Sequence, residues 1–129
     1  MSPVAQVAAV VAVLVHVLVF VWEALLLDRV HHSVFRVPAE HLPAIRLWAF
    51  GVGFYNLFLA GGTVAGLIAV WSGHELVGRT LVLYTAWFMA LSSVVLAVAD
   101  QSAMSRPRNS AWGGVAAQGL PALVILLFA

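Results

Sequence analysis

Four long apolar stretches, separated by short polar segments, make up most of this chain. The stretches cover about residues 4–27, 47–71, 78–100 and 111–129. Each is close to the roughly 20 apolar residues that an α-helix needs to cross a bilayer. What remains is one longer polar segment, residues 28–46, and two short turns. The pattern predicts an all-α integral membrane four-helix bundle in which residues 1–129 form a single transmembrane domain.

Composition supports this prediction and excludes several classes of protein. Hydrophobic residues make up 64% of the 129 positions and charged residues 9%, a balance that a soluble domain of this size cannot cover with a polar surface. The first apolar stretch is longer than a signal-peptide core and has no basic start, so we expect it to remain as a span. Cysteine is absent, which excludes disulfides and thiolate chemistry. No phosphate-binding glycine loop or basic stripe is present, so nucleic acid is not an expected partner.

The arginines predict an orientation in the membrane. The chain has no lysine, and all its six basic residues except Arg79 fall in the first and third polar segments. Short loops rich in arginine stay in the cytoplasm. We therefore expect both termini on the non-cytoplasmic side.

Each apolar stretch carries polar residues at a comparable depth, toward the predicted cytoplasmic side. They are His16 and Glu23 in the first stretch, Tyr55 and Asn56 in the second, Asp100 at the end of the third, and Gln118 in the fourth. A charged group at the centre of a span costs roughly 2.5–3.5 kcal/mol, so such groups usually face the bundle interior. His16 and Glu23 are seven positions apart, about two helical turns, and share a face. The pattern predicts one shared polar site.

Simpler explanations remain open for several of these residues. Asp100 precedes a polar turn and is equally explained as an ordinary helix end. Asn56 and Gln118 are typical of hydrogen bonds between helices, and His16 also fits a donor to a neighbouring helix. Histidines in the first polar segment suggest zinc, but an exposed loop rich in histidine is the commoner explanation. We expect no metal and no cofactor.

Two sequence motifs carry a resemblance to a known family. The segment FYNLFLAGG, residues 54–62, and the segment AAQGLPALV, residues 116–124, together with Glu23, resemble small four-span bacterial membrane proteins of the DUF1304-like type. The matching positions are Tyr55, Asn56, Phe58, Leu59, Ala60, Gln118, Pro121 and Ala122. One departure is that Gly51 and Val52 stand where members commonly carry an Asn-Gln pair. The resemblance covers nearly the full length and implies a multi-pass protein of the bacterial cytoplasmic membrane.

A looser resemblance is to membrane-integrated terpene cyclases, in which buried carboxylic acids protonate an epoxide or alkene of a prenyl chain. It implies a lipidic small-molecule substrate in an apolar, aromatic-lined cavity within the bilayer. In this hypothesis Glu23 or Asp100 is the catalytic proton donor. The substrate-binding residues would be His16, Phe20, Trp22, Tyr55, Asn56, Phe58, Tyr84, Trp87 and Gln118.

Two other functions fit the same polar layer. One is a transporter or binding protein for a proton or a small polar solute. The other is a structural subunit of a membrane complex, which would have a filled interior and no cavity. A transporter of this size would have to oligomerise, and the sequence leaves open whether the chain forms a homo-oligomer.

Overall fold

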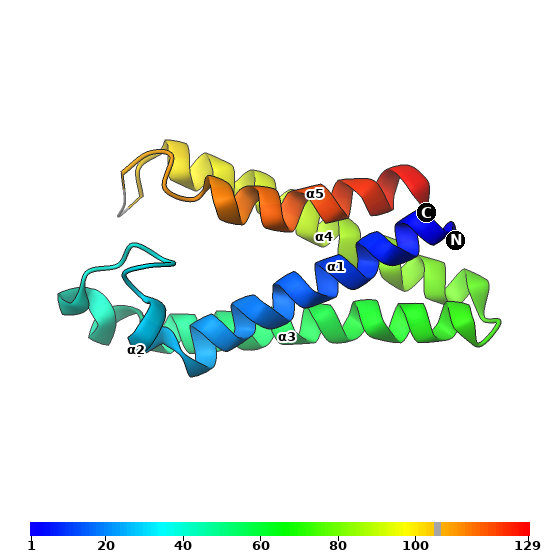
Figure 1. Ribbon diagram of the computed structural model, residues 1–129, viewed down its shortest axis with the longest axis horizontal. Helices are drawn as coiled ribbons and strands as arrows, with labels where there is room; N and C mark the ends of the chain where they lie inside the picture. The colour runs from blue at the N-terminus through cyan, green and yellow to red at the C-terminus, as the bar shows by residue number, and fades with distance from the viewer. Residues whose placement is uncertain (105–106) are drawn as a thin grey trace.

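The computed structural model describes residues 1–104 and 107–129, and its described elements are all helical (Figure 1). In chain order they are α1 (Pro3–Phe20), the π-helix η1 (Val21–Leu25), α2 (Leu27–Val30), the 3₁₀ helix η2 (Ala39–His41), α3 (Leu42–Trp71), α4 (Glu75–Gln101) and α5 (Trp112–Phe128). The predicted all-α bundle is confirmed, with long helices over the four apolar stretches. Arg106, one of the predicted loop arginines, lies outside the described residues.

Three helical segments are long and apolar enough to cross a membrane: Pro3–Leu25, Ala39–Trp71 and Glu75–Gln101. The fourth, α5, has 17 residues. At a rise of about 1.5 Å per residue, α5 spans about 25 Å, somewhat less than the roughly 30 Å of a bilayer's hydrocarbon core. Helix α5 is therefore apolar but short for a span.

Helix α3 starts earlier than the apolar pattern predicts. It begins at Leu42 rather than near residue 47, with Pro43 in its first turn. Proline favours this position because its fixed φ suits a helix and its missing N–H has no partner to lose there. The polar segment predicted over residues 28–46 is correspondingly shorter and contains the short helices α2 and η2.

The four long helices form a ring in which α1 packs against α3 and α5, and α4 packs against the same two helices. Figure 1 shows them crossing near the end that holds both termini and the α3–α4 turn. Away from that end they diverge into two arms, one made of α1 and α3 and the other of α4 and α5. We call the first end the closed end, and the other, which holds residues 26–41 and the α4–α5 connection, the open end.

Small residues allow the helices to pack tightly toward the closed end. The buried core there is made of Ala8, Ala9, Ala12, Leu67, Val82, Ala86, Met89, Ala90, Ala122 and Ile125. Helices α3 and α4 meet at Gly66 and Gly78, where a Cβ on Gly78 would lie 2.5 Å from the Gly66 carbonyl oxygen. The hydroxyls of Thr63 and Thr85 hydrogen-bond across the same pair of helices at 2.9 Å. Only a pair of glycines permits this backbone approach.

Polar contacts tie the four helices together at the closed end. They are Trp71 Nε1 donating to Gln6 Oε1 at 2.7 Å, Arg79 Nη2 donating to the Ala129 carbonyl at 2.9 Å, Ser2 Oγ donating to the Phe128 carbonyl at 2.5 Å, and the Met1 amino group paired with Glu75. Every one of the long helices or its terminus takes part in one of these contacts.

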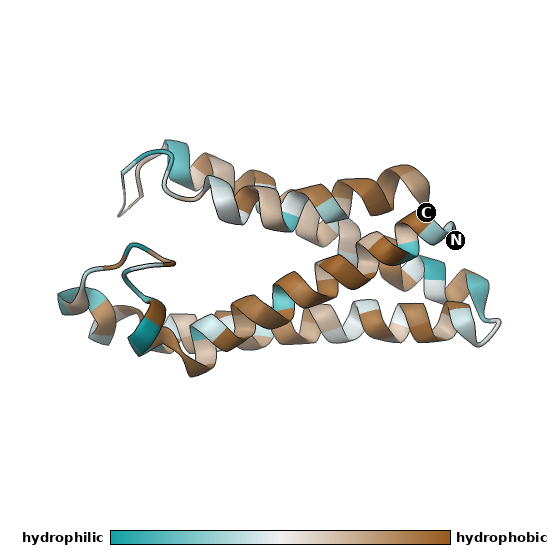
Figure 2. Ribbon diagram, in the orientation of Figure 1, coloured by the Kyte–Doolittle hydropathy of each residue, from teal (hydrophilic) through white to brown (hydrophobic). Residues whose placement is uncertain are grey.

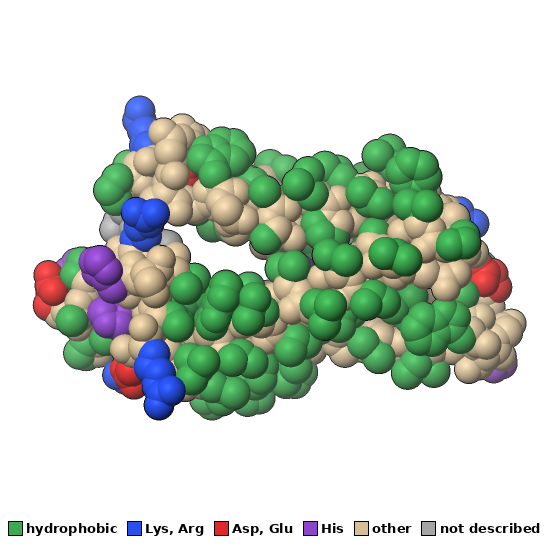
Figure 3. Space-filling model, viewed as in Figure 1, with side chains coloured by type: hydrophobic (Ala, Val, Ile, Leu, Met, Phe, Trp, Pro, Cys, Tyr) green, Lys and Arg blue, Asp and Glu red, His purple; other side chains and the backbone are tan. Residues whose placement is uncertain are grey.

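The outer surface is apolar along the length of the bundle. Large hydrophobic side chains of every long helix are exposed, including Val7, Ile68, Leu91 and Leu127. Figure 2 shows apolar residues along the helices and hydrophilic residues toward the two ends, and Figure 3 shows charged side chains gathered at those ends. This distribution is expected where a protein surface faces lipid.

Candidate functional site

Glu23 lies where the first helix departs from regular α-helical geometry. Residues Val21–Leu25 form one π-helical segment, η1, and such segments occur frequently at functional sites. Gly53 of α3 lies opposite, where a Cβ would approach the Ala24 Cβ to 3.0 Å and the Ala24 backbone nitrogen to 3.1 Å. Because Gly53 has no side chain, η1 packs directly on α3 and brings Glu23 against that helix.

Asn56 holds the carboxyl group of Glu23 in place. Its Nδ2 donates to Glu23 Oε2 at 3.2 Å and to the Val52 carbonyl at 3.1 Å, so both amide hydrogens are used. Within residues 1–104 and 107–129, Glu23 Oε1 has no hydrogen-bonding partner. One oxygen of the carboxyl is thus fixed by the protein, and the other remains available to a ligand.

The space between the two arms is a cavity of about 820 Å³. Figure 3 shows the opening that separates the arms. Apolar side chains such as Val15, Leu18, Val19, Leu59 and Leu96 line much of it. Its volume lies within the roughly 300–1,000 Å³ of small-molecule sites, and an apolar lining with a few polar groups is typical of them.

Six of the predicted site residues line this cavity. They are His16, Trp22, Glu23, Tyr55, Asn56 and Gln118. They come from α1, η1, α3 and α5, so the fold brings together polar groups that are up to about a hundred positions apart in the chain. Phe88 and Ser92 of α4 complete the ring of helices around the cavity.

Four predicted aromatic residues lie outside the cavity lining. Phe20 packs against Phe54 of α3 with ring centroids 5.1 Å apart, and Phe58 continues the same row at 6.1 Å from Phe54. Tyr84 and Trp87 are exposed on α4, by 69% and 57%. These positions indicate helix packing for Phe20 and an outward position for Tyr84 and Trp87.

Asp100, the second predicted catalytic acid, does not line the cavity either. Its carboxylate accepts hydrogen bonds from the backbone nitrogens of Asn109 and Ala111, both at 2.8 Å, and from Ser110 Oγ at 3.3 Å. These bonds order the connection that leads into α5. These hydrogen bonds place Asp100 in the structure of the loop, outside the cavity lining, and its catalytic role stays a prediction.

His16 is the most deeply buried polar group of the lining. Its residue is 1% exposed, and its Nδ1 lies 2.8 Å from the carbonyl oxygen of Ala12, one turn earlier in α1. The hydrogen-bonding partner of the ring is therefore its own helix rather than a neighbouring one.

Loop residues at the open end complete the lining, and no sequence pattern predicted them. They are Ser33, Val34, Phe35 and Arg36 from one arm and Asn109, Ser110 and Ala111 from the other. Arg36 and Asn109 have positive φ values of 56° and 67°. Left-handed backbone at residues other than glycine has no reliable sequence signature.

The open end also carries an exposed ion pair. Arg46 donates to both carboxylate oxygens of Asp28, at 3.0 and 2.6 Å. These hydrogen bonds lower the pKa of Asp28 below its ordinary value.

Within the described residues, no three His, Cys, Asp or Glu side chains are grouped closely enough to hold a metal ion.

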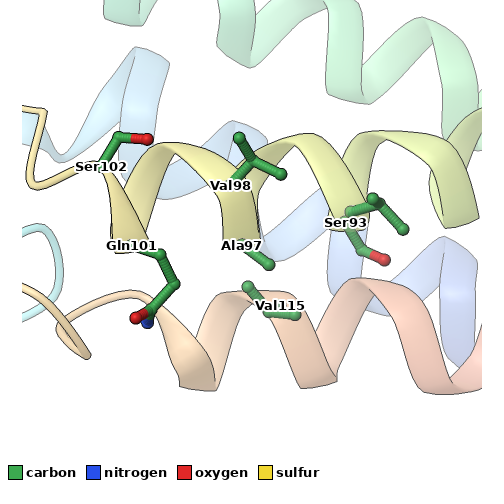
Figure 4. Close-up of a pocket in the computed structure, with 7 residues that line it drawn as sticks. Ser93, Ala97, Val98, Gln101, Ser102 and Val115 are labelled. Atoms are coloured by element: carbon green, nitrogen blue, oxygen red, sulfur yellow. The ribbon is translucent and has the colours of Figure 1, made fainter.

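A second hollow, of about 450 Å³, runs along α4 beside α5 (Figure 4). Ser93, Val94, Ala97, Val98, Gln101, Ser102 and Val115 line it. None of these side chains is an acid or a base, and Ser93 Oγ already donates to the Ala90 carbonyl at 2.8 Å. This hollow has no group for proton transfer, so the larger cavity is the better candidate site.

A family model matches residues 10–129, nearly the whole chain. The chain belongs to the DUF1304 family. The resemblance inferred from the motifs of the second and fourth helices is thereby confirmed. The family is described as proteins of unknown function, and no curated protein and no solved structure matches the chain.

Proposed function

We propose that this DUF1304 protein is a membrane-integrated terpene cyclase that binds a prenyl lipid between its arms and protonates it with Glu23. The observation that carries the proposal is the setting of one acid: Glu23, held by Asn56 at 3.2 Å, lines an apolar cavity of about 820 Å³. A general acid must lie within reach of its substrate. This cavity is large enough to hold a small-molecule substrate beside Glu23.

In the proposed reaction, the substrate enters from the bilayer between the arms. The proton of Glu23 passes to an epoxide oxygen or a terminal alkene, and the resulting carbocation is attacked by a neighbouring double bond to close a ring. Trp22, Tyr55 and Phe88 line the cavity, where aromatic faces attract developing positive charge. Gln118 would hold the polar end of the substrate.

The membrane placement is part of the proposal. All four long helices would cross the bilayer, with the shorter α5 accommodated by local thinning of the bilayer. Arg29, Arg36, Arg46 and Arg108 belong to the open end, whereas Arg79 belongs to the closed end. The positive-inside rule then favours a cytoplasmic open end and termini on the opposite side of the bacterial cytoplasmic membrane.

The shape of the interior favours this function over the two alternatives. A scaffold subunit needs no cavity. A cavity of about 820 Å³ leaves the apolar side chains around it without packing partners. A transporter needs a path to the far side, but Thr63, Val82 and Met89 are fully buried between the cavity and the closed end. A cavity open at one end suits a bound ligand better than a conducted solute.

The test is an assay of membranes containing the protein with epoxidised and plain prenylated substrates, with products followed by mass spectrometry. We expect a cyclised product from the wild type and a loss of at least about 100-fold in Glu23→Gln, the lower range for removing a general acid. Glu40→Gln is the matched control because Glu40 is exposed and does not line the cavity.

Two outcomes would contradict the proposal. One is a folded wild type that converts no substrate in the panel and carries no lipid-like molecule in native mass spectrometry. The other is cyclisation at an undiminished rate in Glu23→Gln. In either case, measurement of proton and solute flux in proteoliposomes would be the next experiment.

A further inference from the structure

The hydrogen bond of His16 determines which ring nitrogen carries the hydrogen and which one can accept. Nδ1 lies 2.8 Å from the Ala12 carbonyl oxygen, which can only accept. We therefore assign the ring hydrogen to Nδ1, and in the neutral ring Nε2 then carries the lone pair.

The second nitrogen of His16, Nε2, is left without a hydrogen bond in the described part of the chain, residues 1–104 and 107–129. In that part of the chain no fully buried side-chain nitrogen or oxygen lacks a partner, so an unpaired Nε2 must be accessible. Since His16 lines the cavity, Nε2 is the nitrogen of its ring that is left to accept from a ligand there.

We propose that His16 Nε2 is the proton acceptor that ends the reaction begun by Glu23. This inference rests on the proposed function. Cyclisation to an alkene is an isomerisation, so the protein must recover from the product the one proton that it gave to the substrate. Glu23 gives that proton, and His16 is the buried base of the same cavity.

The steps balance for an epoxide substrate. The O–H bond of Glu23 breaks, a new O–H bond forms on the epoxide oxygen, and one C–O bond opens. Alkene electrons form the ring C–C bond and leave the positive charge on a ring carbon. A C–H bond beside that carbon breaks, its electron pair becomes the new C=C bond, and the proton goes to Nε2. The imidazolium returns this proton to the Glu23 carboxylate through water that enters from the open end.

The spacing of Glu23 and His16 fits a proton donor and a proton acceptor that act on different atoms of one substrate. They are seven positions apart, His16 in α1 and Glu23 in η1, about 10 Å at the usual helical rise, and both line the cavity. His16 is nearer the closed end. Glu23 and His16 therefore reach different parts of one extended substrate, with the epoxide toward the open end and the deprotonated carbon deeper in the cavity.

The first test compares the products of His16→Gln with those of the wild type. We expect His16→Gln to consume substrate, but with at least about a tenfold smaller yield of the wild-type alkene and with alcohols formed by water capture in its place. His74→Gln is the matched control, because His74 is exposed at the closed end and should leave the products unchanged.

The second test reads the protonation of the His16 ring directly and needs no substrate. Nitrogen-15 NMR of histidine-labelled protein in lipid nanodiscs should show a neutral histidine with a protonated Nδ1 and a bare Nε2 that is missing from the spectrum of His16→Asn. The loss in the variant assigns the signal, because His31 Nδ1 also lies near a backbone carbonyl oxygen, that of Val37 at 2.6 Å. A protonated Nε2 in the neutral ring would overturn the inference.

The outcomes separate this inference from the proposed function. Unchanged products at an unchanged rate in His16→Gln overturn the role of His16 and leave Glu23 in place. Complete loss of substrate consumption in a folded His16→Gln also overturns it, because the acceptor acts after the first protonation. Undiminished cyclisation in Glu23→Gln removes the proposed function itself, and the role of His16 with it.

Discussion

The closed end and the open end of this bundle are built from the same four helices but differ in what fills the space between them. At the closed end, alanine and glycine bring backbones together, and a Cβ on Gly66 would lie 2.9 Å from the Gly78 carbonyl oxygen. At the open end, the arms separate around a cavity of about 820 Å³. One end supplies packing, and the other supplies room for a ligand.

The difference shows how a short chain can combine a stable bundle with a site. Close packing gains dispersion contacts, whereas a cavity forfeits them. In this chain the close contacts lie toward the closed end and the polar lining toward the open end. Substitutions at the closed end should therefore alter stability, and those at the open end should alter ligand binding with little effect on stability.

The largest loss of stability should follow Gly78→Ala. The added Cβ would lie 2.5 Å from the Gly66 carbonyl oxygen and 2.6 Å from the Val70 nitrogen, so the helices must move apart. We expect a cost of about 3 kcal/mol, the upper range for overpacking. Unfolding in mixed micelles would measure it. Gly61→Ala is the control, since nothing lies within 4 Å of a Cβ at that position. Equal stability of the two variants would contradict the close contact of α3 and α4 at the closed end.

Filling the cavity should change binding instead. Ala117 lines the cavity, so Ala117→Phe should weaken binding of a fluorescent prenyl alcohol by about tenfold or more, equivalent to about 1.4 kcal/mol. Its unfolding midpoint should stay close to that of the wild type. Ala116→Phe places the same ring on an exposed position outside the lining and should bind normally. Equal binding by both variants would mean that the probe binds elsewhere.

A smaller effect is expected from Thr63→Val, which removes the 2.9 Å hydrogen bond to Thr85 across α3 and α4. Thr85 keeps its bonds to the carbonyls of its own helix, at 3.1 Å, so no buried group is left unpaired. We expect a loss of about 1 kcal/mol in the free energy of unfolding. Thr80→Val should cost less, because within the described residues the exposed Thr80 bonds only to Leu76 of its own helix. A larger loss in Thr80→Val would contradict this assignment.

The smallest effect concerns Asp28 and Arg46 at the open end. The Arg46 hydrogen bonds lower the pKa of Asp28 in the folded state, so the pair stabilises the fold above the ordinary carboxyl pKa. That contribution disappears as the pH falls through the lowered pKa. An NMR titration should show a higher pKa of Asp28 in Arg46→Gln and in high salt, with little change in the unfolding midpoint. An unchanged pKa would mean that the pair is not formed in solution.

The sequence predicted the helices better than the site. Apolar stretches of about 20 residues have few alternatives to helix, and the four stretches correspond to α1 with η1, α3, α4 and α5. Glu23, Asn56 and Gln118 were recognisable because polar groups in apolar stretches usually face inward. Asp100 satisfied the same criterion, but its carboxylate turned out to bind the backbone of a loop that has no sequence pattern.

The sequence by itself determined that the chain forms long apolar helices, that it belongs to the DUF1304 family, and which polar residues those helices carry. These properties are local, since they depend on hydrophobicity and spacing along one helix. Only the tertiary structure decided that η1 is a π-helical segment, that Gly53 admits Glu23 to the face of α3, and that the arms diverge around a cavity. Each of these features depends on which helix surfaces meet. Close packing between segments that are distant in the chain cannot be predicted from the hydrophobic periodicity of a single helix.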